Sequence, residues 1–178
     1  MITYIALLRG VNVGGHRKLP MADLRTLLSK EGFGTIKTYI QSGNVVFRAS
    51  ESDTSVLKTR VEKAISSTFG FEVPVILMTS REFQEILEQN PFDEEIIPES
   101  YYILLSHAIP EERSKGLTDD HWEQEHFRIT KKCIYLYVEN GYGKAKCSTN
   151  FFEKKLDITA TARNHKTMLK LVSLAAEN

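Results

Sequence analysis

The chain has 178 residues, of which 42% are apolar and 26% charged, a composition typical of a folded domain and too apolar for a disordered or fibrous protein. The longest clean apolar run, Tyr4 to Leu8, is far too short to cross a bilayer, and no basic stretch followed by an apolar segment opens the chain. We therefore expect neither membrane insertion nor secretion. Lysine plus arginine and aspartate plus glutamate both total 23, so the summed charge gives no general attraction to nucleic acid or membranes.

The balanced charge is distributed unevenly along the chain. Residues 1–81 carry a net charge of +5, residues 82–126 carry −11 and residues 127–178 carry +6. This distribution has three interpretations: the acidic segment pairs with the basic ends, it serves to keep the protein in solution, or the basic loops are exposed on a separate rim.

The first half of the chain predicts the order βαββαβ followed by a helix. Met21, Leu24 and Leu28 recur at helical spacing before Gly32, and a hairpin turn is predicted over residues 42–44, Ser-Gly-Asn. The expected elements are strand Thr3–Arg9, a helix from Pro20 to about Glu31, strands Ile36–Gln41 and Val45–Ala49, helix Val56–Phe69, strand Val73–Met78 and a helix capped by Ser80.

The same order recurs in the second half, where strands and helices alternate again before a final helix. The expected elements are strand Tyr101–Ser106, a short helix near Glu111–Gly116, strands His126–Thr130 and Cys133–Glu139, helix Thr149–Leu156, strand Ile158–Ala162 and a last helix over His165–Ala176.

The predicted fold class is therefore α+β, with two tandem ferredoxin-like (βαββαβ) lobes plus a C-terminal helix. Residues 1–90 form the first lobe, residues 91–99, with Pro91 and Pro98, form a linker, and residues 100–178 form the second lobe with the last helix. A single larger mixed sheet is the alternative.

This topology predicts two polar, basic rims, one on each lobe. In the first lobe, loop 10–18 shares an edge with the 42–44 turn, and in the second, loop 140–148 shares an edge with residues 163–166. The residues that we predict to bind a ligand are Arg9, Asn12, Gly14, Gly15, His16, Arg17, Gln41, Ser42 and Asn44 on the first rim, and Lys144, Lys146, Arg163, Asn164 and His165 on the second.

Local motifs on these rims favour the binding of an anion but do not indicate a reaction. Loop 10–18 lies between a strand and a helix as a phosphate loop does, but it matches neither a Walker nor a dinucleotide-binding pattern, and tight turning explains its glycines equally well. Asn164 can cap the last helix beside three basic residues, and Ser148 or Thr149 can cap the helix that follows Lys144 and Lys146. Helix capping and solubilising charges also explain these features.

Metal and nucleophile motifs are weak. A group of acidic and histidine residues lacks ordered ligand spacing, so we predict no metal and no cofactor. These residues are His107, Asp119, Asp120, His121, Glu123, Glu125 and His126. Cys133 and Cys147 show no paired spacing, which predicts reduced thiols in a cytoplasmic protein. Cys147 is either a low-pKa thiol beside Lys146 or a buried one, and no nucleophile and base pair is identified.

Three segments resemble one known family. Leu8-Arg-Gly-Val-Asn-Val-Gly-Gly15, Tyr39-Ile-Gln-Ser-Gly-Asn-Val-Val-Phe47, and Thr161-Ala-Arg-Asn164 with Thr167 are similar to the uncharacterised family called domain of unknown function 1697. The resemblance implies a pair of ferredoxin-like lobes and no established activity, cofactor or catalytic residue. The chain departs from the family pattern at His165, where an aromatic residue, usually Trp, is expected, and at Cys147, where an apolar residue is usual.

The sequence thus favours a cytoplasmic binding module whose basic rims hold a phosphorylated small molecule or a nucleic-acid backbone. Two alternatives remain open. One is an enzyme that acts on such a ligand with His16 or His165 as proton carrier, and the other is a protein-interaction adaptor.

Overall fold

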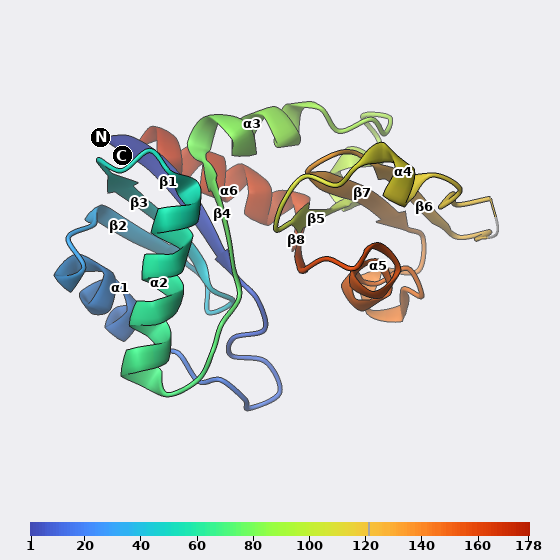
Figure 1. The fold of residues 1–178 in the computed structure, drawn as a ribbon. Coiled ribbons are helices and arrows are strands. Elements are labelled where there is room, and N and C mark those ends of the chain that lie inside the picture. The colour runs from blue at the N-terminus through green and yellow to red at the C-terminus, as the bar shows by residue number, and fades with distance from the viewer. Residues whose placement is uncertain (121) are drawn as a thin grey trace. The chain divides into compact units, whose positions relative to one another are not determined.

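The structure is a computed structural model that describes residues 1–120 and 122–178 (Figure 1). These residues form two four-stranded antiparallel sheets and six α-helices, which confirms the α+β class. The strands form two separate sheets rather than one larger mixed sheet. The chain divides into two compact units, one made of Met1–Gln84 with Lys170–Asn178 and the other of Glu85–Leu169.

The sheet of the first unit has the strand order β2-β3-β1-β4, with every neighbouring pair antiparallel. Strand β1 is central, and its residue Ile5 lies opposite Val46 on one side and Met78 on the other. The elements are β1 (Ile2–Leu8), α1 (Met21–Lys30), β2 (Gly34–Tyr39), β3 (Asn44–Ala49), α2 (Thr54–Phe69) and β4 (Val75–Thr79), followed by α3 (Ser80–Glu88).

Alternation along the strands places one buried cluster of this unit on one face of its sheet, while Ile5 and Leu7 of β1 are buried on the other face. Tyr4, Ala6 and Leu8 of β1 belong to one buried cluster with Leu24 of α1 and Val61 of α2. Figure 1 shows α1 and α2 on this side of the sheet. Burying each such aliphatic side chain stabilises the fold by about 1.5–3 kcal/mol, so this apolar face holds both helices on the sheet.

The sheet of the second unit repeats the arrangement in the order β6-β7-β5-β8, again antiparallel throughout. Ile103 of β5, Leu136 of β7 and Phe152 of α5 belong to its buried cluster. The elements after α3 are the 3₁₀ turn η1 (Ile97–Glu99), β5 (Tyr101–Leu105), α4 (Glu111–Ser114), β6 (Glu125–Ile129), β7 (Cys133–Val138), the 3₁₀ turn η2 (Tyr142–Lys144), α5 (Thr149–Leu156), β8 (Ala160–Asn164) and α6 (His165–Ala176).

Three local predictions need correction. The hairpin turn covers residues 40–43, and Asn44 is the first residue of β3, paired with Tyr39 and fully buried. Strand β8 begins at Ala160, two residues later than predicted, and ends at Asn164 rather than Ala162. Thr79, not Ser80, caps α3, because its hydroxyl accepts the Glu82 N–H at 3.2 Å while the Glu82 carboxylate accepts the Thr79 N–H at 3.0 Å.

The predicted neighbourhood of loop 10–18 and the hairpin turn is confirmed. The Leu8 N–H donates to the Gly43 carbonyl at 2.8 Å, and the Asn12 side-chain amide donates to the Gln41 carbonyl at 2.6 Å. The turn passes so close to β1 that a Cβ on Gly43 would lie 2.6 Å from Leu8 Cβ.

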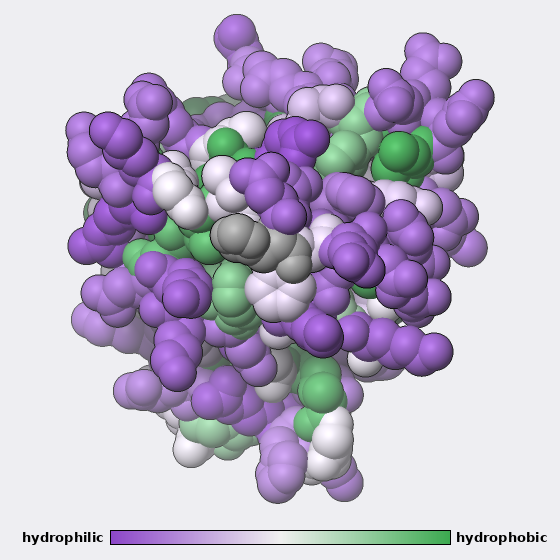
Figure 2. Space-filling view, turned by 90° about the vertical axis from the view of Figure 1, so that its right-hand side faces the viewer, coloured by the Kyte–Doolittle hydropathy of each residue, from purple (hydrophilic) through white to green (hydrophobic). Residues whose placement is uncertain are grey.

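Among the residues described, no helix combines the length and apolarity that a membrane crossing needs. Figure 2 shows a face on which hydrophilic side chains predominate and apolar ones are scattered between them.

Gly43 is the position where we expect the smallest substitution to cost most. Its φ of +73° is strained for any side chain, and an added Cβ would also meet Val11 Cγ2 at 2.7 Å. We predict that Gly43→Ala lowers the free energy of unfolding by about 3 kcal/mol, as measured by urea denaturation. Gly15→Ala is the control, because φ is +78° there but nothing lies within 4 Å, so only about 1 kcal/mol should be lost. Equal losses would show that crowding at Gly43 contributes nothing.

Candidate functional site

Loop 10–18 of the first rim is a small hairpin rather than an open phosphate loop. The Asn12 N–H donates to the Arg17 carbonyl at 3.2 Å and the His16 N–H to the Val13 carbonyl at 3.1 Å. Gly14 and Gly15 at its tip both have positive φ, as two-residue hairpin turns require. The chain reversal therefore accounts for the two glycines.

The first-rim residues divide into a structural and an exposed group. Asn12 holds the loop, because its Oδ1 accepts the Leu19 N–H at 2.8 Å while its amide donates to the Leu19 and Gln41 carbonyls. The buried Asn44 amide donates to the Tyr39 carbonyl and to Ser42 Oγ, which closes the hairpin turn from inside. Arg9 and Ser42 are half-buried, and the exposed members are Gly14, Gly15, His16, Arg17 and Gln41.

On the second rim, loop 140–148 and residues 163–166 follow strand ends at the same sheet edge, as predicted, because Tyr101 lies opposite both Leu136 and Asn164, but one predicted member is buried. Arg163 lies in β8 opposite Tyr102 and is only 8% exposed, and burial lowers the pKa of its guanidinium to about 10. Because the strand runs two residues further than expected, Arg163 is a sheet residue and not part of an exposed loop. Asn164 caps α6 as predicted, since its Oδ1 accepts the Thr167 N–H at 2.9 Å.

His165 belongs to a partly buried polar cluster in the second unit. Its Nδ1 lies 2.9 Å from the Tyr102 hydroxyl, and its ring stacks on Tyr102 at 23° with 5.9 Å between the centroids. The Asn90 amide donates to the same hydroxyl at 2.8 Å. The imidazole thus provides a planar ring at the position where the family resemblance implies an aromatic one.

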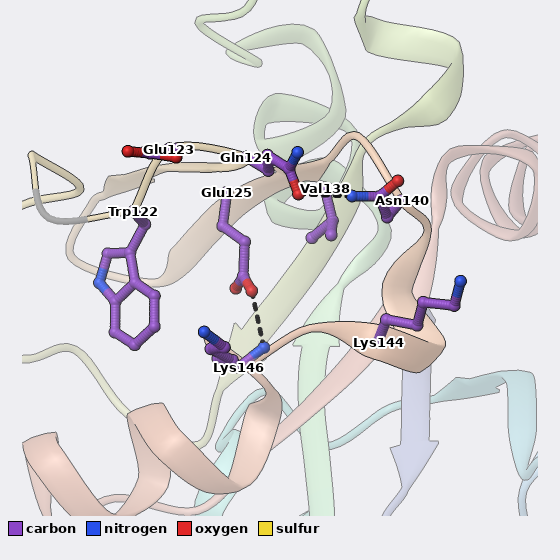
Figure 3. Close-up of a pocket in the computed structure, with 8 residues that line it drawn as sticks. All are labelled: Trp122, Glu123, Gln124, Glu125, Val138, Asn140, Lys144 and Lys146. Atoms are coloured by element: carbon purple, nitrogen blue, oxygen red, sulfur yellow. Dashed lines mark hydrogen bonds between the residues drawn. The ribbon is translucent and has the colours of Figure 1, made fainter.

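Lys144 and Lys146 line a pocket of about 450 Å³ instead (Figure 3). In the view of Figure 3, Trp122 and Lys144 lie on opposite sides of Glu125, whose side chain points toward the backbone of Lys146. The lining residues come from the segment that enters β6, the end of β7 and the loop that follows it: Trp122, Glu123, Gln124, Glu125, Val138, Asn140, Lys144 and Lys146.

Glu125 fixes the loop that carries both lysines. It is 7% exposed, and its two carboxylate oxygens accept the N–H groups of Lys146 at 2.8 Å and Cys147 at 2.7 Å. Hydrogen bonds to a charged acceptor contribute about 1.5–3 kcal/mol each, more than ordinary ones. The pocket therefore has a rigid floor although loop 140–148 has little regular structure.

The pocket walls combine an aromatic face, amides and cations. The Lys146 ammonium lies 5.9 Å from the centre of the Trp122 ring, within the range of a cation–π contact. The Asn140 amide donates to Gln124 Oε1 at 2.6 Å, which joins the loop to the segment before β6. Ser148 occupies the N-cap of α5 without a capping bond, and the Tyr142 hydroxyl accepts the Thr149 N–H instead, which corrects the predicted cap.

The two cysteines are buried and not bridged. Burial, with the nearby Glu125 carboxylate, raises the pKa of the Cys147 thiol to about 12. Cys133 is wholly buried, and burial also raises its pKa. Of the two predicted possibilities for Cys147, the buried thiol is confirmed, and neither thiol is set up as a nucleophile.

Two of the acidic and histidine residues, Asp119 and His126, lie close to groups of opposite charge. Asp119 accepts a hydrogen bond from Arg128 at 2.8 Å and from the Phe127 N–H at 3.1 Å, and Arg128 contributes to lowering the pKa of its carboxyl against the effect of burial. His126 lies 3.5 Å from Glu139 and 3.8 Å from Asp119. In the described part of the chain, no three such side chains are grouped to hold a metal ion, and His121 lies outside that part.

Sequence reasoning missed most of the pocket. Trp122, Gln124, Val138 and Asn140 were not selected, and Glu125 was considered only as a possible metal ligand. One signal was available: Glu125 and Phe127 lie on the same face of a two-residue alternation, so an acidic side chain points into the apolar side of the sheet.

A family model described as "Protein of unknown function (DUF1697)" matches residues 1–135. The chain belongs to this family. The match ends within β7, so Asn140, Lys144 and Lys146 lie beyond the matched residues. None of the curated proteins compared with the chain matches it significantly.

A solved structure has a similar fold. It is described as the structure of the conserved bacterial protein SP0830 from Streptococcus pneumoniae, and it matches with a TM-score of 0.78 and 23% sequence identity over 98% of each chain. At this identity the similarity establishes the shared fold. The shared fold extends over 98% of this chain.

Because Glu125 accepts two backbone N–H groups, we predict that Glu125→Gln lowers the free energy of unfolding. An amide keeps one acceptor oxygen and places N–H donors against a backbone N–H, so we expect a loss of about 2 kcal/mol in urea denaturation. The Cys147 thiol should also react somewhat faster with an alkylating reagent, because burial still raises its pKa but the added contribution of the carboxylate is removed. Glu123→Gln is the control, since Glu123 is exposed in the same pocket and its change should stay within about 0.5 kcal/mol.

The burial of His165 leads us to predict that the stability of the fold decreases at acidic pH. Burial lowers its pKa in the folded state below the ordinary value of 6.5, so the unfolded chain binds a proton first as the pH falls. Stability should therefore decrease below about pH 6.5. We expect His165→Phe, which keeps a ring on Tyr102, to show a smaller decrease between pH 7 and 5 in the free energy of unfolding. Identical pH profiles would contradict the burial of the neutral imidazole.

Proposed function

We propose that this DUF1697 protein is a binding module for a phosphorylated small molecule, held in the pocket beside β6. The observation that carries this proposal is that Lys144 and Lys146, two of the residues selected for anion binding from the sequence, line one pocket with Trp122. A pocket of about 450 Å³ is within the size range of small-molecule sites.

Charge within the pocket supports an anionic ligand despite its two carboxylates. Glu125 is turned to the backbone and accepts two N–H groups, so its charge is compensated within the loop. Glu123 is exposed, as are both lysines. The ammonium groups of Lys144 and Lys146 are then the compact cations available to phosphate oxygens, and lysine binds phosphate as a point charge.

Trp122 supports a ligand that also has a planar group. Its ring packs edge-on against Phe151 at 5.9 Å, which fixes its orientation, and Lys146 lies over one face. An aromatic face next to cations is suited to stacking a ring while the phosphate binds the ammonium groups. Among phosphorylated ligands, these contacts favour a nucleotide-like molecule.

We further propose that both units are ferredoxin-like lobes in tandem. The strand orders β2-β3-β1-β4 and β6-β7-β5-β8 are the orders that a βαββαβ chain gives when each crossover surrounds an inserted strand. On this proposal the first lobe covers residues 1–90, a linker covers 91–99 and the second lobe covers 100–178, of which the last nine residues pack with the first compact unit. The two unbridged cysteines also support a cytoplasmic location.

The single tryptophan of the chain makes the pocket directly observable. We expect AMP to change Trp122 fluorescence in a saturable way and inorganic phosphate to compete with it. Lys144→Ala and Lys146→Ala should each weaken AMP binding by about tenfold, because each removes one charge-assisted contact.

The matched controls are Lys154→Ala and Lys155→Ala, which remove exposed charges from the last turn of α5 outside the pocket. They should leave AMP binding unchanged. The proposed function would be refuted if neither AMP nor phosphate changed the fluorescence or the melting temperature of the protein. It would also be refuted if the Lys154 and Lys155 variants weakened AMP binding as much as the Lys144 and Lys146 variants do.

A further inference from the structure

Two neighbouring hollows lie on the helix side of the first unit, away from every residue selected from the sequence. One, of about 440 Å³, is lined by α1, Phe33 and the first residues of β2, and the other, of about 260 Å³, is lined by α2. Arg60 connects them, because it lines the hollow on α2 while its guanidinium carbon lies 4.8 Å from the ring centre of Phe33, which lines the other. We call the two hollows together the α1–α2 groove.

The α1–α2 groove is strongly basic. Arg25 and Lys30 of α1 and Arg60 and Lys63 of α2 line it, and no carboxylate of the described residues does. These four cations form a local positive field in a protein whose total charge is zero, and of the four only Lys63 also lines the adjoining hollow that contains Glu62 and Glu72. The groove is therefore the kind of surface that attracts an anion.

The nearest acids on α2 are engaged elsewhere. Asp53 accepts the Ser55 N–H at 2.8 Å and the Ser55 hydroxyl at 2.6 Å as the cap of α2. Glu62 accepts the Val75 N–H at 2.9 Å and lies 3.9 Å from Lys58. Neither carboxylate lines the groove to neutralise its cations.

Both arginines are held in position by single internal bonds. One Arg25 nitrogen donates to the Thr38 hydroxyl at 2.6 Å, and one Arg60 nitrogen donates to the Glu31 carbonyl. A guanidinium has five N–H donors, so most of the donors on each exposed side chain are still available to a ligand. Little rotamer entropy is then lost when a ligand binds.

Hydroxyl groups complete the lining, although those of Thr26, Ser55 and Thr59 donate their protons to the Ala22 carbonyl, the Asp53 carboxylate and the Ser55 carbonyl, which leaves the cations as the main donors to a ligand. Thr26 and Ser29 on α1 and Ser55 and Thr59 on α2 lie among the four cations. Arginine, lysine, serine and threonine are the side chains that contact the phosphates and sugars of nucleic acids without reading bases. A groove with this lining on both sides of Arg60 suits a chain of regularly repeated phosphates better than one isolated anion.

An acidic peptide is the competing occupant, and the lining disfavours it. A docked helix needs apolar pockets at helical spacing for its anchors. The aromatic residue of this groove, Phe33, is only 5% exposed and lies beneath Arg60. The exposed lining is cationic and hydroxylic apart from Val56, and one exposed aliphatic side chain does not form a row of anchor pockets at helical spacing.

We propose that the α1–α2 groove binds the phosphodiester backbone of a nucleic acid, independently of base sequence. Single strands and duplexes carry the same backbone chemistry, so oligonucleotides of both forms are the probes. The site lies in the first unit and does not depend on the pocket beside β6, so either proposal can fail alone.

The experiment is fluorescence anisotropy with labelled mixed-sequence oligonucleotides of about 16 nucleotides and the full chain. Four cations predict a slope of log K against log salt near −3 for a single strand, at about −0.7 per neutralised phosphate. Arg25→Gln with Lys30→Gln should reduce this slope by about half and weaken binding by about tenfold. If the duplex binds more tightly than the single strand, the preferred ligand of the groove is double-stranded nucleic acid.

The controls separate this groove from diffuse charge. Lys58→Gln removes a charge from α2 that does not line the groove. Lys154→Gln with Lys155→Gln removes two charges from α5 in the second unit. Both controls, and Lys144→Ala with Lys146→Ala, should keep at least about half of the affinity. Arg60→Gln should weaken binding while Arg60→Lys restores part of it, with melting temperatures confirming that each variant is folded.

Several outcomes would overturn the proposal. One is the absence of oligonucleotide binding at about 50 mM salt. Others are an equal loss in the control variants, loss only in Lys144→Ala with Lys146→Ala, or displacement of the oligonucleotide by polyglutamate at the same charge concentration. The paired Arg25 and Lys30 substitution keeps the test decisive even if Arg60→Gln fails to fold, because both of its side chains are exposed.

Discussion

The central strand of each sheet is buried along nearly its whole length, so its backbone N–H and C=O groups need partners on two neighbouring strands. Tyr4 to Leu8 of β1 and Tyr102 to Leu105 of β5 are all less than about 5% exposed. An unpaired buried amide costs about 1–3 kcal/mol. This requirement places β3 and β4 beside β1, and β7 and β8 beside β5, and it decides which loops meet at each sheet edge.

Periodicity in the sequence was sufficient to predict the elements and their order. Helices α5 and α6 have the predicted ends, and the other boundaries lie within about two residues, because apolar spacing reports which face is buried. Side-chain placement was less predictable. A strand that begins two residues late makes Arg163 a buried sheet residue, and Asn44 pairs in β3 because its amide bonds within the hairpin turn.

The pocket beside β6 was predictable only in part, because it combines residues that are distant in sequence. Lys144 and Lys146 are recognisable in the sequence as charges before a helix, whereas no motif points to Trp122. Glu125 resembled one more acid in a segment rich in acids. Its bonds to Lys146 and Cys147 depend on the pairing of β6 with β7, which brings residues 125 and 138 opposite each other.

The return of residues 170–178 to the first unit has a consequence for biosynthesis. These residues leave the ribosome only after the whole of the second unit, which at about 5–20 residues per second delays them by about 4–17 s. During that interval the edge strand β2 lacks the contacts of Lys37 with Glu177 and of Thr35 with Asn178. The nascent first unit thus spends seconds with an incompletely covered strand edge, the stage at which chaperones protect folding chains.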